Sequence, residues 1–271
     1  MAAVINTNMA SLQAQNQLSK TTASLNNTIQ QLSSGLRVSS SKDDASGYSI
    51  AKGMDSTIRG SNQAIRNIND AISLTQTTSG ALETLSNLMG RMRELAIQAG
   101  NDSNTVNGGY LDKEYKGLAA EALRVIAATK FNGVSTFTAT AFAFRVSSVT
   151  ADTTLTLTPT VMTAVAAASA TTVGIATTAT AVTTLGLLDT AITEIGTVGA
   201  ELGAFQSRLT FAQDFLKDLV ENTSAAKSRI VDTDFAAQTA ELSKYQILQQ
   251  AGTAMLAQAN QMGSNVLTLL K

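Results

Sequence analysis

Apolar residues recur along the first hundred positions with the spacing of amphipathic helices. In the first stretch they fall mostly three, four or seven residues apart, at Ile5, Met9, Leu12, Leu18, Leu25, Ile29, Leu32 and Leu36. The same rhythm resumes at Ile58 and continues through Met92 to about Gly100. Such spacing places side chains on one face of a helix. The pattern therefore predicts two long helices, joined through the serine-rich segment QLSSGLRVSSSKDDASGYSIAKGM, residues 31–54.

A change of pattern follows a third predicted helix, which runs from Leu111 to near Lys130 after the turn-forming segment NDSNTVNGGY. Beyond it, VSSVTADTTLTLT alternates polar and apolar residues, which predicts a β-hairpin over residues 137–159 with its turn at 150–152. The next segment, TAVAAASATTVGIATTATAVTT, carries no charge and is low in complexity. Its composition leaves strand, loop and helix open over residues 160–184.

The clearest periodicity lies in the last third of the chain. Steps of three and four residues, as in a heptad seam, connect Leu188, Ala191, Ile195, Val198, Leu202, Phe205, Leu209, Ala212, Leu216 and Leu219. At about 1.5 Å per residue, the predicted helix over residues 184–230 is roughly 70 Å long. A final helix carries Leu248, Met255, Ala259, Met262, Val266 and Leu269 on one stripe. We expect a mainly α fold, a long antiparallel coiled-coil bundle forming a rod with a small β-hairpin region.

Both ends of the chain are poor in charge. Residues 245–270 contain no charged side chain, and Lys20 is the only charge between the N-terminus and Arg37. The amides in the last helix would cost more in a bilayer than its leucines would gain, so we expect no membrane span. Amides can instead pair across helix interfaces with other protein chains. This favours self-assembly; the alternative is that the ends are frayed termini of a monomer.

Composition narrows the chemistry that the chain can perform. With no His and no Cys among its 271 residues, it lacks the usual general base, thiol nucleophile and zinc ligands. The formal net charge of -1 disfavours nucleic acid as a partner. We expect no cofactor, no metal and no enzyme activity, because no nucleophile is grouped with a base. A hydrolase or glycan-binding module that needs only two carboxylates stays open as an alternative. The N-terminus has no basic region followed by an apolar core, so export would use a route other than a conventional signal peptide.

Several long motifs carry a family resemblance. They are NTNMASLQAQNQL, QLSSGLRVSSSKDDASGYSIA, RMRELAIQAGN, KFNGV and SRIVDTDFAAQTAELSKYQILQQAGTAMLAQANQ. These stretches, within roughly the first 135 and last 85 residues, resemble bacterial flagellin. The resemblance implies a secreted, extracellular subunit of the flagellar filament, exported unfolded by the flagellar type III route. A hook-filament junction protein, a flagellin relative, is the alternative.

The resemblance also implies a division of the chain. Residues 1–40 and 233–271 are expected as terminal helices that pair in an inner tube, residues 41–135 and 185–232 as the two halves of a rod, and residues 136–184 as a short variable region. The residues expected to pack subunits in the inner tube are Ile5, Leu12, Leu18, Leu25, Ile29, Leu32, Leu248, Met255, Met262, Val266 and Leu269. The serine-rich segment becomes the connector, in which Arg37, Lys42, Asp43 and Asp44 offer intersubunit charges. Asp43 or Asp44 is equally well explained as a helix N-cap.

Further partners are implied by the same resemblance. They are other copies of the chain, an export chaperone that holds residues 236–271, and the hook-filament junction and cap proteins. By position, Arg91, Leu95 and Glu114 match residues through which the Toll-like innate receptor of animals contacts flagellins; the alternative is that Arg91 and Glu114 are solvated rod residues that serve lateral packing. The threonine-rich variable region is a candidate for O-glycosylation, with an exposed, tolerant loop as the alternative.

Overall fold

The computed structural model describes residues 8–101, 108–147, 154–158 and 161–268, with side chains as far as Gln261. The chain divides into two compact units. The terminal unit combines Met1–Thr57 with Asn222–Lys271, and the central unit is Ile58–Glu221. Two long helices, α2 (Ala45–Ala99) and α5 (Thr178–Val231), contribute residues to both units.

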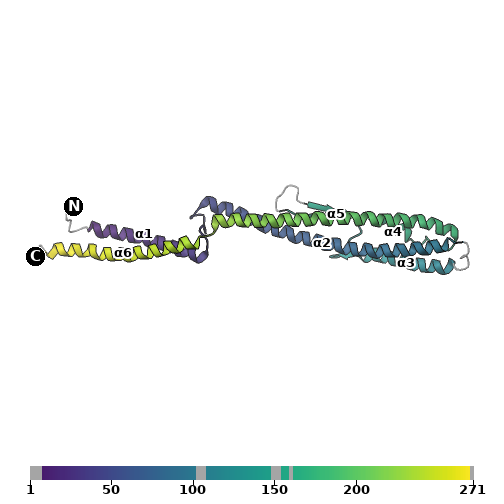
Figure 1. The fold of residues 1–271 in the computed structure, drawn as a ribbon, viewed down its shortest axis with the longest axis horizontal. Helices are drawn as coiled ribbons and strands as arrows, with labels where there is room; N and C mark the ends of the chain where they lie inside the picture. Colours follow the sequence, from purple (N-terminus) through teal and green to yellow (C-terminus); the bar gives the residue numbers. More distant parts are fainter. Residues whose placement is uncertain (1–7, 102–107, 148–153, 159–160, 269–271) are drawn as a thin grey trace. The chain divides into compact units, whose positions relative to one another are not determined.

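The terminal unit is built on a pair of helices, α1 (Met9–Ser34) and α6 (Phe235–Thr268). They run antiparallel, because Asn8 at the start of α1 bonds Ala259 near the end of α6, whereas Gln31 near the end of α1 bonds Gln238 near the start of α6. Figure 1 shows the two helices side by side with their outer ends together. The first helix ends at Gly35, whose left-handed φ of 70° suits glycine. The sequence prediction of paired terminal helices is confirmed for a single chain.

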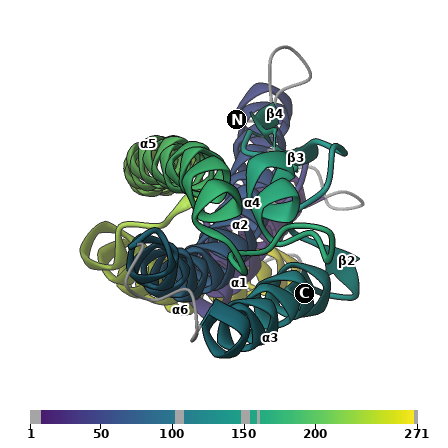
Figure 2. The same cartoon turned by 90° about the vertical axis from the view of Figure 1, so that its right-hand side faces the viewer.

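The central unit packs the long helices α2 and α5 with α3 (Gly108–Ala128) and the short α4 (Thr163–Ala168). Figure 2 shows α3 beside α2, as does Figure 1. On α5 the predicted seam is buried at Leu188, Ala191, Ile195, Val198, Leu202, Phe205, Leu209 and Leu216, and partly buried at Ala212 and Leu219. It packs in one core with α2 residues that include Ile68, Leu85, Met89 and Met92. The mainly α fold expected from the sequence is confirmed.

A predicted β-hairpin is also present in the central unit. Strand β3 (Phe142–Arg145) pairs antiparallel with β4 (Thr154–Leu157), and Arg145 lies opposite Thr154. The expected turn at residues 150–152 lies outside the described residues. Phe144 fastens the hairpin to the bundle, with its ring centroid 6.3 Å from that of Phe205 on α5.

A second, smaller pair joins β1 (Lys130–Phe131) to β2 (Val134–Ser135). Its turn is Asn132-Gly133, with φ values of 49° and 81°. Asn-Gly is the dipeptide that tight hairpin turns favour, because both residues must adopt positive φ. Sequence reasoning did not predict this pair, although KFNGV contains the signal.

The low-complexity segment that the sequence left open contains α4, a loop and the start of α5 six residues before the expected position 184. The first turn of α4 is held by the side chain of Glu194 on α5. The carboxylate accepts hydrogen bonds from the backbone N–H groups of Thr163, Ala164 and Val165 at 3.1, 2.9 and 3.0 Å, and from the Thr163 hydroxyl at 3.0 Å. Glu194 thus caps a helix from another part of the chain.

Helix α3 holds the same segment further along. The Tyr115 hydroxyl donates to the Ala168 carbonyl at 2.6 Å, and Asp112 accepts from the Ile175 N–H at 2.9 Å. The Val165, Ala168 and Ile175 side chains are fully buried. Residues 161–177 are therefore a fastened part of the central unit and do not form a loose loop.

Candidate functional site

The contact between α1 and α6 is a heptad seam made largely of small and polar residues. Its positions, in steps of three and four, are less exposed than their neighbours on both helices. They are Ser11, Ala14, Leu18, Thr21, Leu25, Thr28 and Leu32 on α1, and Gln238, Leu242, Tyr245, Gln249, Gly252, Leu256 and Ala259 on α6. Five of the fourteen positions are leucines and one is Tyr245, so the seam buries apolar surface, but less than a seam made entirely of leucines.

Polar groups of this seam bond between the two helices. The Asn8 amide donates to the Ala259 carbonyl at 2.8 Å, and the Ser11 hydroxyl donates to the Asn260 side chain at 2.8 Å. At the other end, the Gln238 amide donates to Gln31 Oε1 at 2.7 Å. These bonds set the register of the pair. Of the amides in residues 245–270 that were expected to pair across helix interfaces, Asn260 bonds α1 within one chain, and pairing with other copies stays a prediction.

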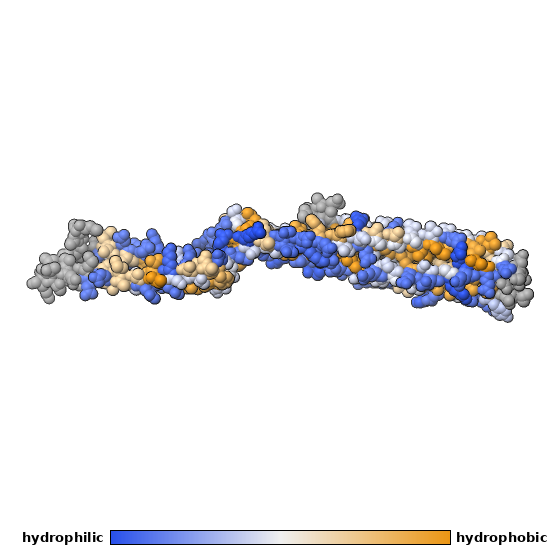
Figure 3. Space-filling model, in the orientation of Figure 1, coloured by the Kyte–Doolittle hydropathy of each residue, from blue (hydrophilic) through white to orange (hydrophobic). Residues whose placement is uncertain are grey.

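Large apolar side chains of the same two helices remain outside the seam. Met9 and Met255 are each 64% exposed, and Ile247 is 65% exposed. Leu12, Ile29 and Leu248 are exposed as well. In Figure 3 hydrophobic surface lies over the terminal helices. The pair therefore places small residues together with several leucines inside and leaves these six large apolar side chains in solvent.

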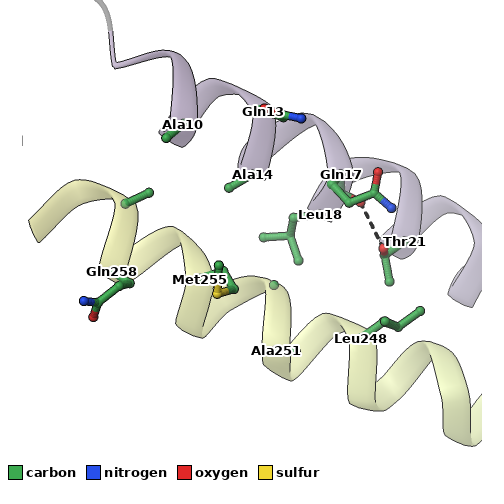
Figure 4. A pocket seen from close by; sticks show the side chains of 12 residues that line it. Ala10, Gln13, Ala14, Gln17, Leu18, Thr21, Leu248, Ala251, Met255 and Gln258 are labelled. Atoms are coloured by element: carbon green, nitrogen blue, oxygen red, sulfur yellow. Dashed lines mark hydrogen bonds between the residues drawn. The ribbon is translucent and has the colours of Figure 1, made fainter. Parts of the chain in front are cut away.

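A groove opens between the two helices, along the first half of α1 and the second half of α6. Its volume is about 520 Å³. Figure 4 shows Leu18 of α1 and Leu248 and Met255 of α6 along it. Gly252 belongs to its wall, where an added Cβ would lie 3.2 Å from Leu18 Cδ1. The remaining lining residues are Ala10, Gln13, Ala14, Gln17, Thr21, Ala251, Gln258 and Ala259.

The residues predicted to pack subunits divide into three groups. Leu25 is buried and Leu18 and Leu32 are half-buried in the seam, so within one chain they already pack between α1 and α6. Leu12, Ile29, Leu248 and Met255 are exposed. Ile5 and Leu269 lie outside the described residues, and Met262 and Val266 belong to α6 beyond the described side chains.

The two acidic residues of the connector form local hydrogen bonds. Asp44 caps α2, because its Oδ1 accepts from the N–H groups of Ser46 and Gly47 at 3.0 and 2.9 Å. Asp43 Oδ2 accepts from the backbone N–H and hydroxyl groups of Ser40 and Ser39. The Ser40 backbone bond, then the hydroxyls of Ser40 and Ser39, lower the pKa of Asp43 below its ordinary value.

The connector is fastened to the end of α5. Arg37 donates from its backbone N–H to the Val231 carbonyl at 2.7 Å and from its guanidinium to the Ile230 carbonyl. Next to it, Leu36 and Asp232 form an antiparallel bridge. Lys42 is exposed. The connector is thus hydrogen-bonded to the end of α5, and the guanidinium of Arg37 already has a partner within the chain.

The three residues matched to receptor contacts lie in the central unit. Arg91 pairs with Glu114 at 2.7 Å and with Glu94 at 3.0 Å, and all three side chains are exposed. Hydrogen bonds to Glu114 and then Glu94 raise the pKa of Arg91. Leu95 is 1% exposed and packs in the core. The structure therefore brings Arg91 and Glu114 together at the surface and places Leu95 beneath it.

Within the described part of the chain, no group of three or more acidic, His or Cys residues is placed to hold a metal ion. Nor does any described helix segment combine the length and apolar character that crossing a bilayer requires.

Sequence reasoning missed the small and polar positions of the seam between α1 and α6, because it followed only apolar residues. The signal was available: Ser11, Thr21 and Thr28 keep heptad spacing with Leu18 and Leu25.

Comparison with known proteins places both ends of the chain in one family. A model of the bacterial flagellin N-terminal helical region matches residues 5–141, and a model of the bacterial flagellin C-terminal helical region matches residues 185–270. Flagellin FlaB2 of Treponema pallidum (strain Nichols) is 36% identical over 286 residues, which cover 99% of this chain and 100% of that protein. The flagellar filament 33 kDa core protein of Treponema phagedenis is 34% identical over 290 residues, with 99% and 100% covered.

Among solved structures, a crystal structure of Bacillus cereus flagellin aligns with a TM-score of 0.49 at 32% identity, over 60% of this chain and 94% of that one. The family models account for both helical ends, and the relatives match along almost the whole length. The chain belongs to the bacterial flagellin family.

Proposed function

We propose that this chain builds the bacterial flagellar filament as its structural subunit, and that copies hold one another through the exposed apolar residues of α1 and α6. Flagellins are a structural protein family, and the similar proteins of Treponema are named as filament core proteins or flagellins. The observation that carries the residue-level proposal is the contrast within the terminal unit. Small and polar residues share its seam with leucines, while Met9, Leu12, Ile247 and Met255 face solvent.

Burial against other copies gives a reason for this contrast. Fully burying one large aliphatic side chain contributes about 1.5–3 kcal/mol, so the exposed residues together contribute several kcal/mol per subunit. With small or polar residues at more than half of its positions, the seam stabilises the pair less than a seam of leucines would. The terminal helices would therefore be poorly ordered in the free chain and become ordered on assembly, when copies cover their outer faces. This arrangement also suits a chain that is exported unfolded.

The division into inner-tube helices, rod halves and variable region is part of this proposal, with boundaries at 40/41, 135/136, 184/185 and 232/233. The connector is expected at the junction between the two layers, where Lys42 is the exposed charge most available to a neighbouring copy. Asp43 and Asp44 act there first as turn and helix caps.

Secretion to the cell exterior, binding of residues 236–271 by an export chaperone, and contact with the junction and cap proteins complete the proposed life of the subunit. Arg91 and Glu114 are the surface residues offered to a Toll-like innate receptor. We expect no enzyme activity. The hook-filament junction alternative is disfavoured by the match along the full length of flagellins.

Growth of filaments from seeds tests the proposal. We expect purified chain to elongate seeds, and the variants Leu12→Gln and Met255→Gln to raise the critical concentration at least tenfold. Ile97→Gln is the matched control, since Ile97 is also an exposed apolar residue but lies near the end of α2 in the central unit. Equal growth of wild type and both terminal variants would overturn the residue assignment. A wild-type chain that does not propagate on seeds would instead support the junction-protein reading.

A further inference from the structure

Two phenylalanines of α5 lie outside every buried cluster of the described residues. Phe211 is 76% exposed and Phe215 is 66% exposed. The chain has only 8 Phe among 271 residues, so it places a quarter of a scarce residue type in solvent at this site. Side chains four residues apart lie on the same face of a helix. Phe211 and Phe215 therefore form one patch, which we call the phenylalanine patch.

The patch points away from the core of its own unit. Residue Gln213 between the two phenylalanines donates a hydrogen bond to Asn69 of α2 at 2.7 Å, which marks the side of α5 that faces α2. Residues two apart on a helix differ by about 200° around its axis, so both phenylalanines point roughly opposite to Gln213. The seam residues Leu209 and Leu216 are already buried without them. The patch contributes nothing to the central core that this single chain forms.

Polar residues surround the patch. Arg208 lies one turn before Phe211 and is exposed. Asp218 lies one turn after Phe215 and is exposed as well, and it stands about 140° from Gln213 around the helix axis, on the side of the phenylalanines. An aromatic centre with a charged, solvated rim is the arrangement found at protein–protein contacts, where large aromatic side chains supply most of the binding energy.

We propose that the phenylalanine patch is a contact between copies of this chain in the filament, made by the central unit in addition to the terminal helices. The inference rests on the proposed function, since it needs a polymer of copies. It names as partner a second copy of the chain.

The size of the patch favours a polymer contact over a dimer contact. Two fully buried aromatic side chains account for at most about 500 Å². A stable isolated interface buries about 800 Å² per partner, so the patch alone cannot hold a dimer. In a filament the same contact repeats beside the terminal contacts, and linked contacts act at a high effective concentration. The free chain is therefore expected to be monomeric and the patch to be covered only on assembly.

Cysteine labelling gives a direct test, because the natural chain has no cysteine. A maleimide reagent would be applied to Phe215→Cys as monomer and as seeded filament, with wild-type monomer added so that most neighbours are natural. We expect labelling in the monomer and at least tenfold slower labelling in the filament. Leu216→Cys is the matched control, because Leu216 is 2% exposed and should be slow in both states. Equal labelling of Phe215→Cys in both states would overturn the inference.

A second variant measures the contribution of the patch to growth. We expect Phe211→Ala with Phe215→Ala to keep the melting temperature of the monomer within about 2 °C and to raise the critical concentration at least tenfold. A critical concentration within twofold of wild type would overturn the inference. So would a wild-type monomer that already forms dimers through the patch, or one that binds vesicles of neutral lipid through it. If wild-type chain forms no filament, the proposed function itself fails, which separates the two failures.

Discussion

Removal of the Glu194 carboxylate is the sharpest test of how the central unit is held together. In the variant Glu194→Ala, the backbone N–H groups of Thr163, Ala164 and Val165 lose their acceptor, as does the Thr163 hydroxyl. The exposed donors of Thr163 can turn to water. Those of Ala164 and Val165 lie in a part-buried place and lose their partner outright.

Leaving a buried donor unsatisfied costs about 1–3 kcal/mol, so two donors give an expected loss of about 3 kcal/mol after partial rehydration. For a unit of the size of Ile58–Glu221, each kcal/mol lowers the melting temperature by about 2–4 °C. We therefore expect Glu194→Ala to melt about 6–12 °C below wild type. Glu194→Gln, which keeps one acceptor oxygen, should lose roughly half as much.

Circular dichroism of the monomer measures this shift, and hydrogen exchange locates it. Exchange at the amides of Ala164 and Val165 should accelerate strongly in Glu194→Ala, while the α2 amides change little. Glu201→Ala is the matched control, because Glu201 is an exposed glutamate two turns further along α5. If Glu194→Ala and Glu201→Ala melt at the same temperature, the interhelical cap does not stabilise the unit and the reasoning is wrong.

Three further outcomes are expected. Burial, and then the charge of Asp112, raise the pKa of Tyr115 to about 12 from 10.0. The stability contributed by its neutral form is present below about pH 10 and is lost as the pH rises towards 12. Urea unfolding across that range should therefore show a free energy of unfolding that depends less on pH in Tyr115→Phe than in wild type. Gly90→Ala should stabilise α2 by up to about 1 kcal/mol, since an added Cβ meets nothing within 4 Å. Gly108→Ala should destabilise the central unit, because its Cβ would lie 2.6 Å from a backbone oxygen. Opposite shifts in melting temperature check both. Asp44→Ala should cost about 0.5–2 kcal/mol through loss of the N-cap of α2, and unchanged exchange of the Ser46 amide would contradict this.

Helix periodicity predicted most of the fold because each long helix buries one stripe against a partner. The seam from Leu188 to Leu219 could be read from spacing alone, and all its members are buried or partly buried. The hairpin of β3 and β4 could be read from alternation, since each strand keeps one face on the bundle. The segment 161–177 could not, because alanine favours helix whereas threonine favours strand, so their mixture gives no consistent preference. The contacts that hold this segment come from Glu194, Tyr115 and Asp112 on distant helices.

The candidate site shows the same division. Charge-poor ends pointed to assembly, but sequence grouped Leu12 and Leu18 on one stripe, whereas the structure places Leu18 in the seam and Leu12 in solvent. An isolated periodicity of three and four cannot tell which of two adjacent stripes meets the partner helix. The choice depends on the small residues opposite, such as Gly252, which let the helices approach. Leu95 likewise was matched to a receptor contact together with Arg91 and Glu114, whereas the structure buries it in the core.

By itself the sequence determined that this protein is a set of long helices with charge-poor ends and without the His and Cys side chains of zinc and thiol sites, because periodicity and composition are local properties that every fold of the chain must respect. Only the tertiary structure decided which side chains remain uncovered. Exposure depends on what each helix packs against, so the small seam of α1 and α6, the cap of Glu194 and the solvent-facing Phe211 and Phe215 emerge only when distant segments are brought together.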